Sequence, residues 1–510
     1  MPTNNSTIAK NTLYLYLRML FMMGISLYTS RVVLDALGIE DYGIRDVVGG
    51  VVGMFGVLNA SISTATSRYI TFSLGKNDLS HTKKVFSNAV IIHFIIATMV
   101  LLLCETIGTW FLNHKLIIPE RRLFAANCVF QISLLSLFMY ILQVPYNALI
   151  TAYEKMNVYA YISIFDAVAK LLIVYLLIII PFDKLITYTA LGLLVSLLDI
   201  LIYQIYCRRN FVESRFSFSI DKALFKDMFQ FAGWNFFGSI AWMLRDQGVN
   251  VVLNLFMGPA ANAARGVAMQ VSGAVQSLSN NFTMAVIPQI TKNYASGAFY
   301  EMEILAYRGA KFSFLLLFFL AFPLMLNLDF ILGLWLKEVP VYANIFIILI
   351  LIDSMSNSLF STPFITSLMA TGKIRNYQIC VSAIILCIVP TGYFVLKIGY
   401  DVATIFLVMI FFTTLSGFAR YAFCVKQIGY QWTRLFQLVI IPLSLFVITS
   451  IPIPLLCKNF IFYQNNLSSF IFLCLIAMVC NTLSALYIGM TTHERKTIVQ
   501  HALQKIRIKR

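Results

Sequence analysis

The sequence has few charged residues for its length. Only 12% of its 510 residues are Asp, Glu, Lys or Arg, whereas 59% are hydrophobic. A soluble domain carries about 25% charged residues, so this composition excludes an ordinary soluble protein. No polar stretch is long enough to form a separate soluble domain. Since each crossing of a membrane needs roughly 20 apolar residues, the chain has room for many membrane-spanning helices.

The motifs of nucleotide-binding and hydrolytic enzymes are also absent. The sequence contains no G-x-x-x-x-G-K-[ST], no H-E-x-x-H and no G-x-S-x-G. Its nine cysteines form no C-x-x-C pair and mostly lie in apolar segments, where cysteine behaves as a small hydrophobic residue. We therefore expect no enzymatic activity, no cofactor and no metal site.

A net charge of +16 raises the question of nucleic-acid binding. The Lys and Arg residues concentrate in the polar segments on one side of the apolar ones, which is the pattern of the positive-inside rule. This asymmetry predicts that both termini are cytoplasmic. We attribute the basicity to membrane topology and to contact with anionic membrane lipids, and we expect no nucleic-acid partner.

Two halves of the chain resemble each other. Three residues recur at a constant offset of 218 positions: Pro145, Ala152 and Lys155 return as Pro363, Ala370 and Lys373. Residues 45–71 also align without a gap on residues 265–291, with eight identities. Because six predicted helices separate each feature from its copy, the halves share one orientation in the membrane. Parallel repeats of this kind are typical of transporters.

The predicted fold is an all-α integral membrane protein of about fourteen transmembrane helices, arranged as two parallel six-helix bundles with two extra helices. The expected parts are an N-terminal bundle (1–206), a basic cytoplasmic linker (207–227), a C-terminal bundle (228–424), helices 13 and 14 (425–490) and a basic cytoplasmic tail (491–510). The first two spans of each half are predicted at 12–33, 45–70, 228–256 and 262–288.

Five arginines fall within or at the ends of these first two spans: Arg18, Arg31, Arg45, Arg245 and Arg265. A charge inside a membrane is costly, so each should face a partner or a watery cavity. The planar guanidinium donates two parallel hydrogen bonds and stays charged, which suits a phosphate group. We predict that these arginines bind substrate. The alternative is that some of them, Arg31 and Arg45 in particular, only extend to the membrane interface.

Three acidic residues are candidates for binding the proton or sodium ion that drives transport: Asp199, Asp246 and Asp353. Their spacing does not choose among them. Asp166 and Lys170 are four residues apart on one helix, so we expect them to form a structural ion pair. Pro145 and Pro363 lie near the cytoplasmic ends of helices 4 and 10. Each is either a hinge or a fixed kink that only shapes its helix.

The pattern P-[YF]-x5-A-x-x-K at the ends of helices 4 and 10, and G-x3-Y-G after helix 1, resemble those of the Wzx-type oligosaccharide flippases. These transporters belong to the MATE-like superfamily of multidrug, oligosaccharidyl-lipid and polysaccharide exporters. The resemblance covers nearly the whole chain and implies two bundles that work by alternating access. It also implies arginines in the central cavity, on the helices that carry Arg18, Arg45 and Arg265 here.

The function implied by this resemblance is the flipping of an undecaprenyl-pyrophosphate-linked oligosaccharide across a bacterial inner membrane. That oligosaccharide would be a repeat unit of O-antigen, capsule or exopolysaccharide, and proteins of polysaccharide assembly would be further partners. The alternatives are a cation-coupled multidrug antiporter, a lipid II flippase, a membrane-embedded polymerase, ligase or acyltransferase, and a non-transporting scaffold. Arg31 lies about 20 Å along the helix axis from Arg18, too far for a tight arginine cluster, which disfavours lipid II.

Overall fold

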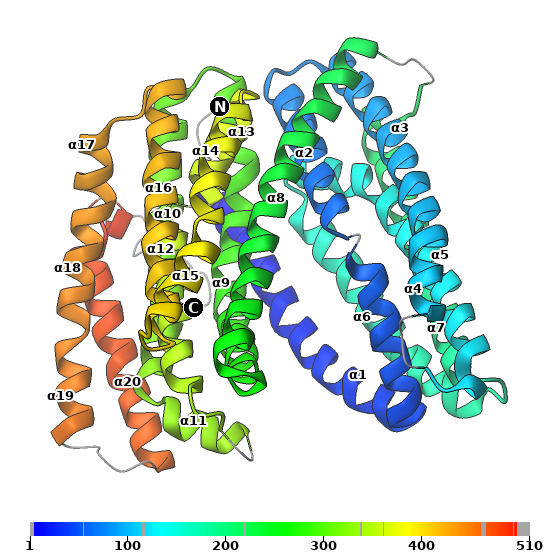
Figure 1. The fold of residues 1–510 in the computed structure, drawn as a ribbon. Helices are drawn as coiled ribbons and strands as arrows, with labels where there is room; N and C mark the ends of the chain where they lie inside the picture. Colours follow the sequence, from blue (N-terminus) through cyan, green and yellow to red (C-terminus); the bar gives the residue numbers. More distant parts are fainter. Residues whose placement is uncertain are drawn as a thin grey trace, which may run out of the picture. The chain divides into compact units, whose positions relative to one another are not determined.

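The structure is a computed structural model of the chain (Figure 1). It describes residues 5–54, 56–114, 118–217, 221–336, 339–360, 362–460, 466–492 and 494–496. Several side chains in the first two helices, that of Arg31 included, lie outside the described residues. The chain forms two compact units: Met1–Ile240 with Thr291–Ala298, and Ala241–Ile290 with Phe299–Arg510.

The first unit is built from helices separated by short turns. They are α1 (Asn5–Met54), α2 (Gly56–Gly75), α3 (Leu79–Leu103), a π-helical turn (Cys104–Gly108), α4 (Thr109–His114), α5 (Glu120–Ala152), α6 (Met156–Ile179), α7 (Lys184–Asn210), a 3-10 turn (Val212–Ser214) and the first part of α8 (Lys222–Met257). α1 consists of two helical arms that meet at Gly38, whose φ of 78° no helix can accommodate. Glycine is suited to this position because it has no Cβ to clash.

The second unit contains the rest of α8 and most of α9 (Pro259–Ala295). It continues through α10 (Phe299–Leu326), α11 (Leu328–Trp335), α12 (Ala343–Phe360), α13 (Thr362–Thr371), α14 (Arg375–Leu386), α15 (Ile388–Ile398) and α16 (Thr404–Ile428). Two further apolar runs follow, α17 (Trp432–Leu435) to α19 (Pro452–Phe460) through α18 (Ile441–Ser450), and α20 (Leu467–Ser484). No strand occurs in any range that the structure describes.

Ten helical runs of the described chain are long and apolar enough to cross a membrane, from Leu79–His114 to Leu467–Gly489. The all-α membrane class is therefore confirmed, while the number fourteen remains a prediction. The four predicted spans outside this set are 12–33, 45–70, 228–256 and 262–288, which lie in α1, α2, α8 and α9. Three of these helices, α1, α8 and α9, carry the five arginines that are predicted to bind substrate.

The internal duplication extends to the backbone. Left-handed residues recur at the offsets seen in the sequence, with similar φ angles: Gly38 at 78° and Gly258 at 71°, Asn77 at 56° and Gly297 at 79°, Glu154 at 60° and Gly372 at 76°. Such a conformation ends a helix and turns the chain sharply. The backbone of the two halves therefore turns at matching positions.

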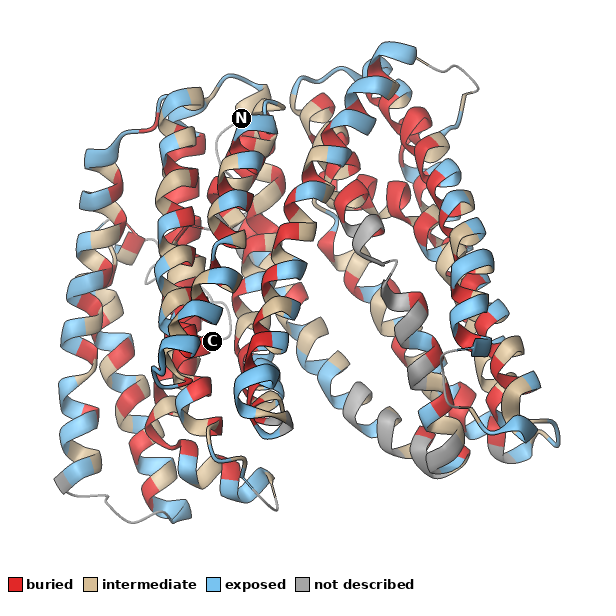
Figure 2. Ribbon diagram, in the orientation of Figure 1, coloured by how far each residue is buried: buried red, intermediate tan, exposed pale blue. Residues whose placement is uncertain are grey.

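Helix packing is also repeated within the two units. In the first unit α5 packs against α7 and α3, and in the second α12 packs against α16 and α10. Buried residues line the faces that neighbouring helices of one unit share, and exposed residues cover the remaining faces (Figure 2). Large apolar residues such as Phe411 and Ile448 are among the exposed ones, as expected for faces that contact lipid.

The segment after the last span is attached to α10 by charge. Thr491 and Glu494 form a capping box, in which the Thr491 amide donates to the Glu494 carboxylate at 2.8 Å and the Glu494 amide donates to Thr491 Oγ1 at 3.3 Å. The same carboxylate accepts a 2.6 Å bond from Nζ of Lys311, a side chain only 2% exposed. Burial opposes ionisation of Glu494, but Lys311 and the Thr491 bonds outweigh it and lower its pKa.

This attachment should be sensitive to acid. Because the folded protein lowers the pKa of Glu494, the stabilisation is complete above the ordinary value of 4.5 and is lost as pH falls through the lowered pKa. We expect Glu494→Gln to reduce the free energy of unfolding at neutral pH by about 3 kcal/mol, since it leaves Lys311 buried without a counter-charge. Thermal unfolding in detergent should show this difference shrinking on acidification. An equal difference at neutral and acidic pH would contradict the assignment.

Candidate functional site

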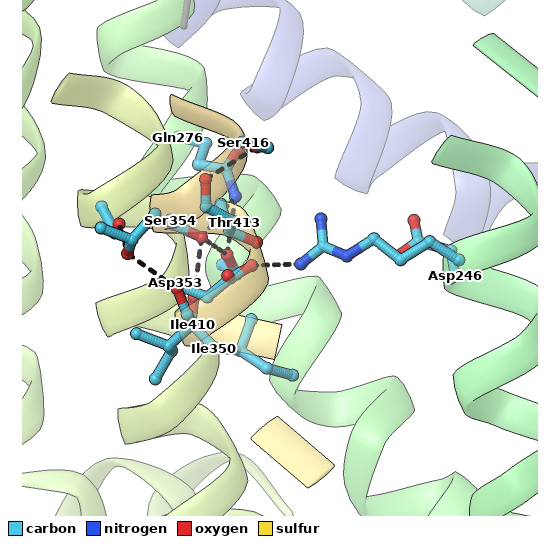
Figure 3. Close-up of polar contacts among 12 residues, drawn as sticks. Asp246, Gln276, Ile350, Asp353, Ser354, Ile410, Thr413 and Ser416 are labelled. Carbon is cyan, nitrogen blue, oxygen red and sulfur yellow. Dashed lines mark hydrogen bonds and ion pairs between the residues drawn. The ribbon is translucent and has the colours of Figure 1, made fainter. Parts of the chain in front are cut away.

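A buried ion pair joins α8 to α12 in the second unit. Nη2 of Arg245 lies 2.5 Å from Oδ2 of Asp353, and the two residues are only 4% and 7% exposed. The Arg245 guanidinium also lies over the Trp242 ring, 4.8 Å from its centroid. Attraction between opposite charges is strong where water is scarce, and each charge would be costly there without the other. Figure 3 shows this bond reaching Asp353.

A second buried arginine comes from α9. Nη1 of Arg265 donates to Oδ1 of Asn250 at 2.5 Å, and Nη2 lies 3.4 Å from Oδ1 of Asp246. Arg265 is 3% exposed, whereas the Asp246 side chain is 43% exposed. The structure thus brings Arg245 and Arg265 each beside one acid. The four formal charges of the two pairs cancel.

Some hydrogen-bonding capacity of this group stays unused. Nε of Arg245, Nε of Arg265 and Oδ1 of Asp353 are buried and have no hydrogen-bond partner among the described residues. Buried polar atoms are normally paired, and an unpaired one costs about 1–3 kcal/mol. The two Nε–H groups can therefore donate a hydrogen bond to a ligand or an ordered water, and Oδ1 can accept one, without breaking an existing bond.

Next to Asp353 begins a network of uncharged side chains. Gln276 on α9 donates from Nε2 to Ser272 Oγ and to Ser354 Oγ, both at 2.8 Å, and the two serine oxygens are 3.0 Å apart. Ser354 Oγ also donates to the backbone oxygen of Ile350. Gln276, Asp353 and Ser354 converge from two helices (Figure 3). The network fixes α9 against α12.

The network borders a cavity of about 220 Å³ within the second unit. The lining residues come from α8, α9, α10, α12 and α13: Trp242, Gln276, Ser279, Asn280, Thr283, Ser313, Leu317, Ser354, Asn357, Ser358, Thr362 and Ile365. None of them carries a charge, and nine of them have an amide or a hydroxyl group. A cavity with this lining favours a neutral polar ligand or water over an ion.

The arginines of the first unit lie against aromatic rings. The Arg18 guanidinium is 4.6 Å from the centroid of the Tyr159 ring, and its Nε has no hydrogen-bond partner among the described residues. The Arg45 guanidinium lies 4.2 Å from the Tyr42 ring and 5.7 Å from that of Tyr188. Cation–π contact stabilises each charge.

Acidic residues of the first unit meet between α6 and α7. Lys170 Nζ lies 2.8 Å from Asp166, which confirms the predicted structural pair. Asp199 is buried, and its Oδ1 has no hydrogen-bond donor among the described residues. Of the three acids predicted for ion coupling, Asp199 is thus the one that forms no salt bridge with a described residue, although Lys170 is near enough to interact with it electrostatically. Asp353 and Asp246 each face an arginine.

The two predicted hinge prolines differ in setting. Pro145 lies inside α5, which runs unbroken from Glu120 to Ala152. Pro363 is the second residue of α13, where the missing N–H costs no helical hydrogen bond. A Cβ on Gly309 of α10 would lie 2.9 Å from Pro363 Cγ, so the two helices approach closely there. Whether either proline bends during transport stays a prediction.

Sequence reasoning missed two features of this site. The Arg245–Asp353 pair spans 108 positions, and no local pattern indicates it. The cavity had a detectable signal, because Ser272, Gln276, Ser279 and Thr283 recur on α9 every three or four residues. That spacing places them on one helix face.

A double-mutant cycle tests whether Arg245 and Asp353 depend on each other. We expect Arg245→Met and Asp353→Leu each to lower the free energy of unfolding by about 3–5 kcal/mol, because each leaves the other group buried and unpaired. The double variant Arg245→Met/Asp353→Leu should lose clearly less than the sum. Asp246→Asn, at the longer contact with Arg265, is the matched control and should cost less. Additive losses in thermal unfolding would refute the coupling.

Comparison with known proteins identifies the fold. The family described as polysaccharide biosynthesis protein matches residues 8–294. No curated protein matches the sequence. Among solved structures, a MATE mutant aligns with a TM-score of 0.71 at 12% identity, over 86% of this chain and all of that one.

Two further structures have the same fold. A MOP superfamily transporter from Pyrococcus furiosus, described as having a binding pocket of reverse polarity, aligns with a TM-score of 0.69 at 12% identity over 85% of this chain and 99% of its own. A mutant MATE transporter from Vibrio cholerae aligns with a TM-score of 0.68 at 15% identity over 84% of this chain and all of its own. The chain is a multi-pass membrane protein with the fold of these transporters, not of an enzyme, and it belongs to the polysaccharide biosynthesis protein family.

Proposed function

We propose that this protein flips a lipid-linked oligosaccharide from the inner to the outer leaflet of a bacterial inner membrane. The substrate would be a repeat unit of O-antigen, capsule or exopolysaccharide on undecaprenyl pyrophosphate. The observation that carries the proposal is that a transporter fold of the polysaccharide biosynthesis family holds buried arginines beside an uncharged polar cavity. Arginine donates charge-assisted hydrogen bonds to the pyrophosphate, and amides and hydroxyls form hydrogen bonds with the hydroxyl groups of sugars.

The role of the predicted arginines is to bind the substrate. Arg18 and Arg45 lie against aromatic rings, and the Nε–H groups of Arg245 and Arg265 have no hydrogen-bond partner among the described residues. Arg31 belongs to the same proposed set, although its side chain lies outside the described residues. The lipid tail stays in the membrane, and both chain termini lie in the cytoplasm. Anionic lipids and the proteins of polysaccharide assembly are the proposed partners.

Ion coupling is part of the proposal, with Asp199 as the favoured residue. It is buried, its Oδ1 accepts no hydrogen bond from a described residue, and the Asp166–Lys170 pair on α6 is close enough to interact with it. Asp353 is already neutralised by Arg245 at 2.5 Å, so a metal cation would have to displace a guanidinium there. This arrangement favours a proton on Asp199 over sodium on Asp353.

A cation-coupled multidrug antiporter is the second candidate, because the solved structures with this fold include multidrug MATE transporters. A cationic drug needs an acidic or aromatic site. In the second unit, Asp246 and Asp353 each face an arginine and so offer a cationic drug no unpaired negative charge. This pairing supports the oligosaccharide over the drug.

Complementation of a strain that lacks its own O-antigen flippase tests the proposal. We expect the wild type to restore surface polysaccharide, and Arg18→Glu and Arg265→Glu to reduce it at least about tenfold at equal membrane abundance. A lost charge-assisted bond to phosphate is worth roughly 1.5–3 kcal/mol, and reversal adds repulsion. Arg209→Glu, at the exposed end of α7, is the matched control and should export normally.

Normal polymer output from both charge-reversed variants would contradict the arginine assignment. If the wild type restores no polymer but confers resistance to cationic drugs or dyes, the antiporter function replaces the proposal. Arg18→Gln and Arg265→Lys, milder changes, separate loss of binding from loss of folding.

A further inference from the structure

The cavity in the second unit has a property that the proposed function leaves unexplained. A phosphate site needs cations and a lipid site needs apolar walls, yet its lining has no charge, and nine of its twelve residues have an amide or a hydroxyl group. Polar groups inside a membrane protein are costly unless a polar partner meets them. The lining therefore indicates the chemistry of what occupies the cavity.

Several lining groups can form hydrogen bonds. Oγ of Ser313 is buried and has no partner among the described residues, and Ser313 is itself only 2% exposed. The side chains of Asn280, Asn357 and Ser279 also border the cavity, and each has an amide or a hydroxyl group. Amides and hydroxyls both donate and accept, as the hydroxyl groups of a sugar do.

The remaining walls suit a ring-shaped ligand. Trp242 offers an aromatic surface, which packs against the C–H faces of a sugar while its N–H can find a polar partner. The volume of about 220 Å³ is below the roughly 300–1,000 Å³ of pockets for drug-sized ligands, so it holds a single ring rather than a chain of them.

The cavity also adjoins the charged group. Trp242 lies beneath the Arg245 guanidinium, and Ser354 follows Asp353 in the chain. A neutral ligand can occupy this cavity without disturbing the Arg245–Asp353 pair, whereas an ion would compete for one of its members. The position thus favours an uncharged ring next to a balanced pair of charges.

We propose that this cavity is a binding subsite for one neutral, hydroxyl-rich sugar ring. The inference rests on the proposed function, since the ring would belong to the transported oligosaccharide. Asn280, Asn357, Ser279 and Ser313 bind its hydroxyl groups, and Trp242 packs against one of its faces. The Gln276–Ser354 network keeps α9 and α12 in place around it.

Fluorescence titration of the purified protein tests the subsite. The probes are methyl glycosides of the common neutral hexoses and N-acetylhexosamines, with the cation tetraphenylphosphonium as a charged comparison. We expect at least one glycoside to give a saturable change in tryptophan fluorescence that Trp242→Phe abolishes. Tetraphenylphosphonium should not give this signal. Since the lining offers it no negative charge, a Trp242 response to it would overturn the assignment.

Two variants and one control locate the binding. Asn357→Leu and the milder Ser313→Ala should weaken glycoside binding, the former at least about tenfold, because a site built on hydrogen bonds loses them. Asn481→Leu is the matched control: its amide on α20 is also buried and unpartnered, but it does not line the cavity. It should bind like the wild type. No saturable signal with any glycoside, or equal affinity in all three variants, would overturn the subsite.

Export by the same variants distinguishes this inference from the proposed function. If the wild type exports polymer but binds no glycoside at Trp242, the subsite is wrong and the flippase function stands. If glycosides bind at Trp242 but no polymer is exported, the flippase function is wrong and the subsite stands. A cavity that holds water only would leave the fluorescence of Trp242 unchanged by every glycoside.

Discussion

Charge inside a membrane protein must be balanced locally, and the ion pair of Arg245 and Asp353 meets this requirement in the second unit. Its atoms are 2.5 Å apart and nearly inaccessible, so their attraction is strong and the loss of either would leave a costly charge. The pair joins α8 to α12 and sets Trp242 and Ser354 on the wall of one cavity. With Arg265 and Asp246 added, the charges still cancel, so a neutral ligand meets no electrostatic competition there.

The duplicated scaffold carries different chemistry in its two halves. Left-handed turns and helix pairings recur, at Glu154 and Gly372 for example. The position of Asp353, moved back by 218 residues, is occupied by Leu135, so the first half has no copy of that ion pair. Asp199, a buried acid of that half, forms no salt bridge with a described residue and lies beside the Asp166–Lys170 pair. One unit thus presents balanced charges beside a neutral cavity, and the other presents arginines on aromatic rings and a buried acid next to an ion pair.

Much of the fold could be predicted from the sequence, because hydropathy, positive charge and repeated residues report directly on membrane helices and their order. The Asp166–Lys170 pair was also predictable, since it is local to one helix. The pairing of Arg245 with Asp353 was not, because it depends on how α8 and α12 pack, and hydropathy carries no information on that. The polar stripe on α9 indicates a cavity, but its other walls come from four other helices, two of which, α12 and α13, are distant in sequence.

Transport by the purified protein would decide whether it flips a lipid-linked oligosaccharide. The protein would be reconstituted into liposomes that carry a fluorescent undecaprenyl-pyrophosphate-linked oligosaccharide in one leaflet, with a membrane-impermeant quencher reporting its position. The account predicts that the oligosaccharide crosses to the other leaflet only when the protein is present, and that a cationic dye does not cross. Movement of the dye with no movement of the oligosaccharide would contradict it.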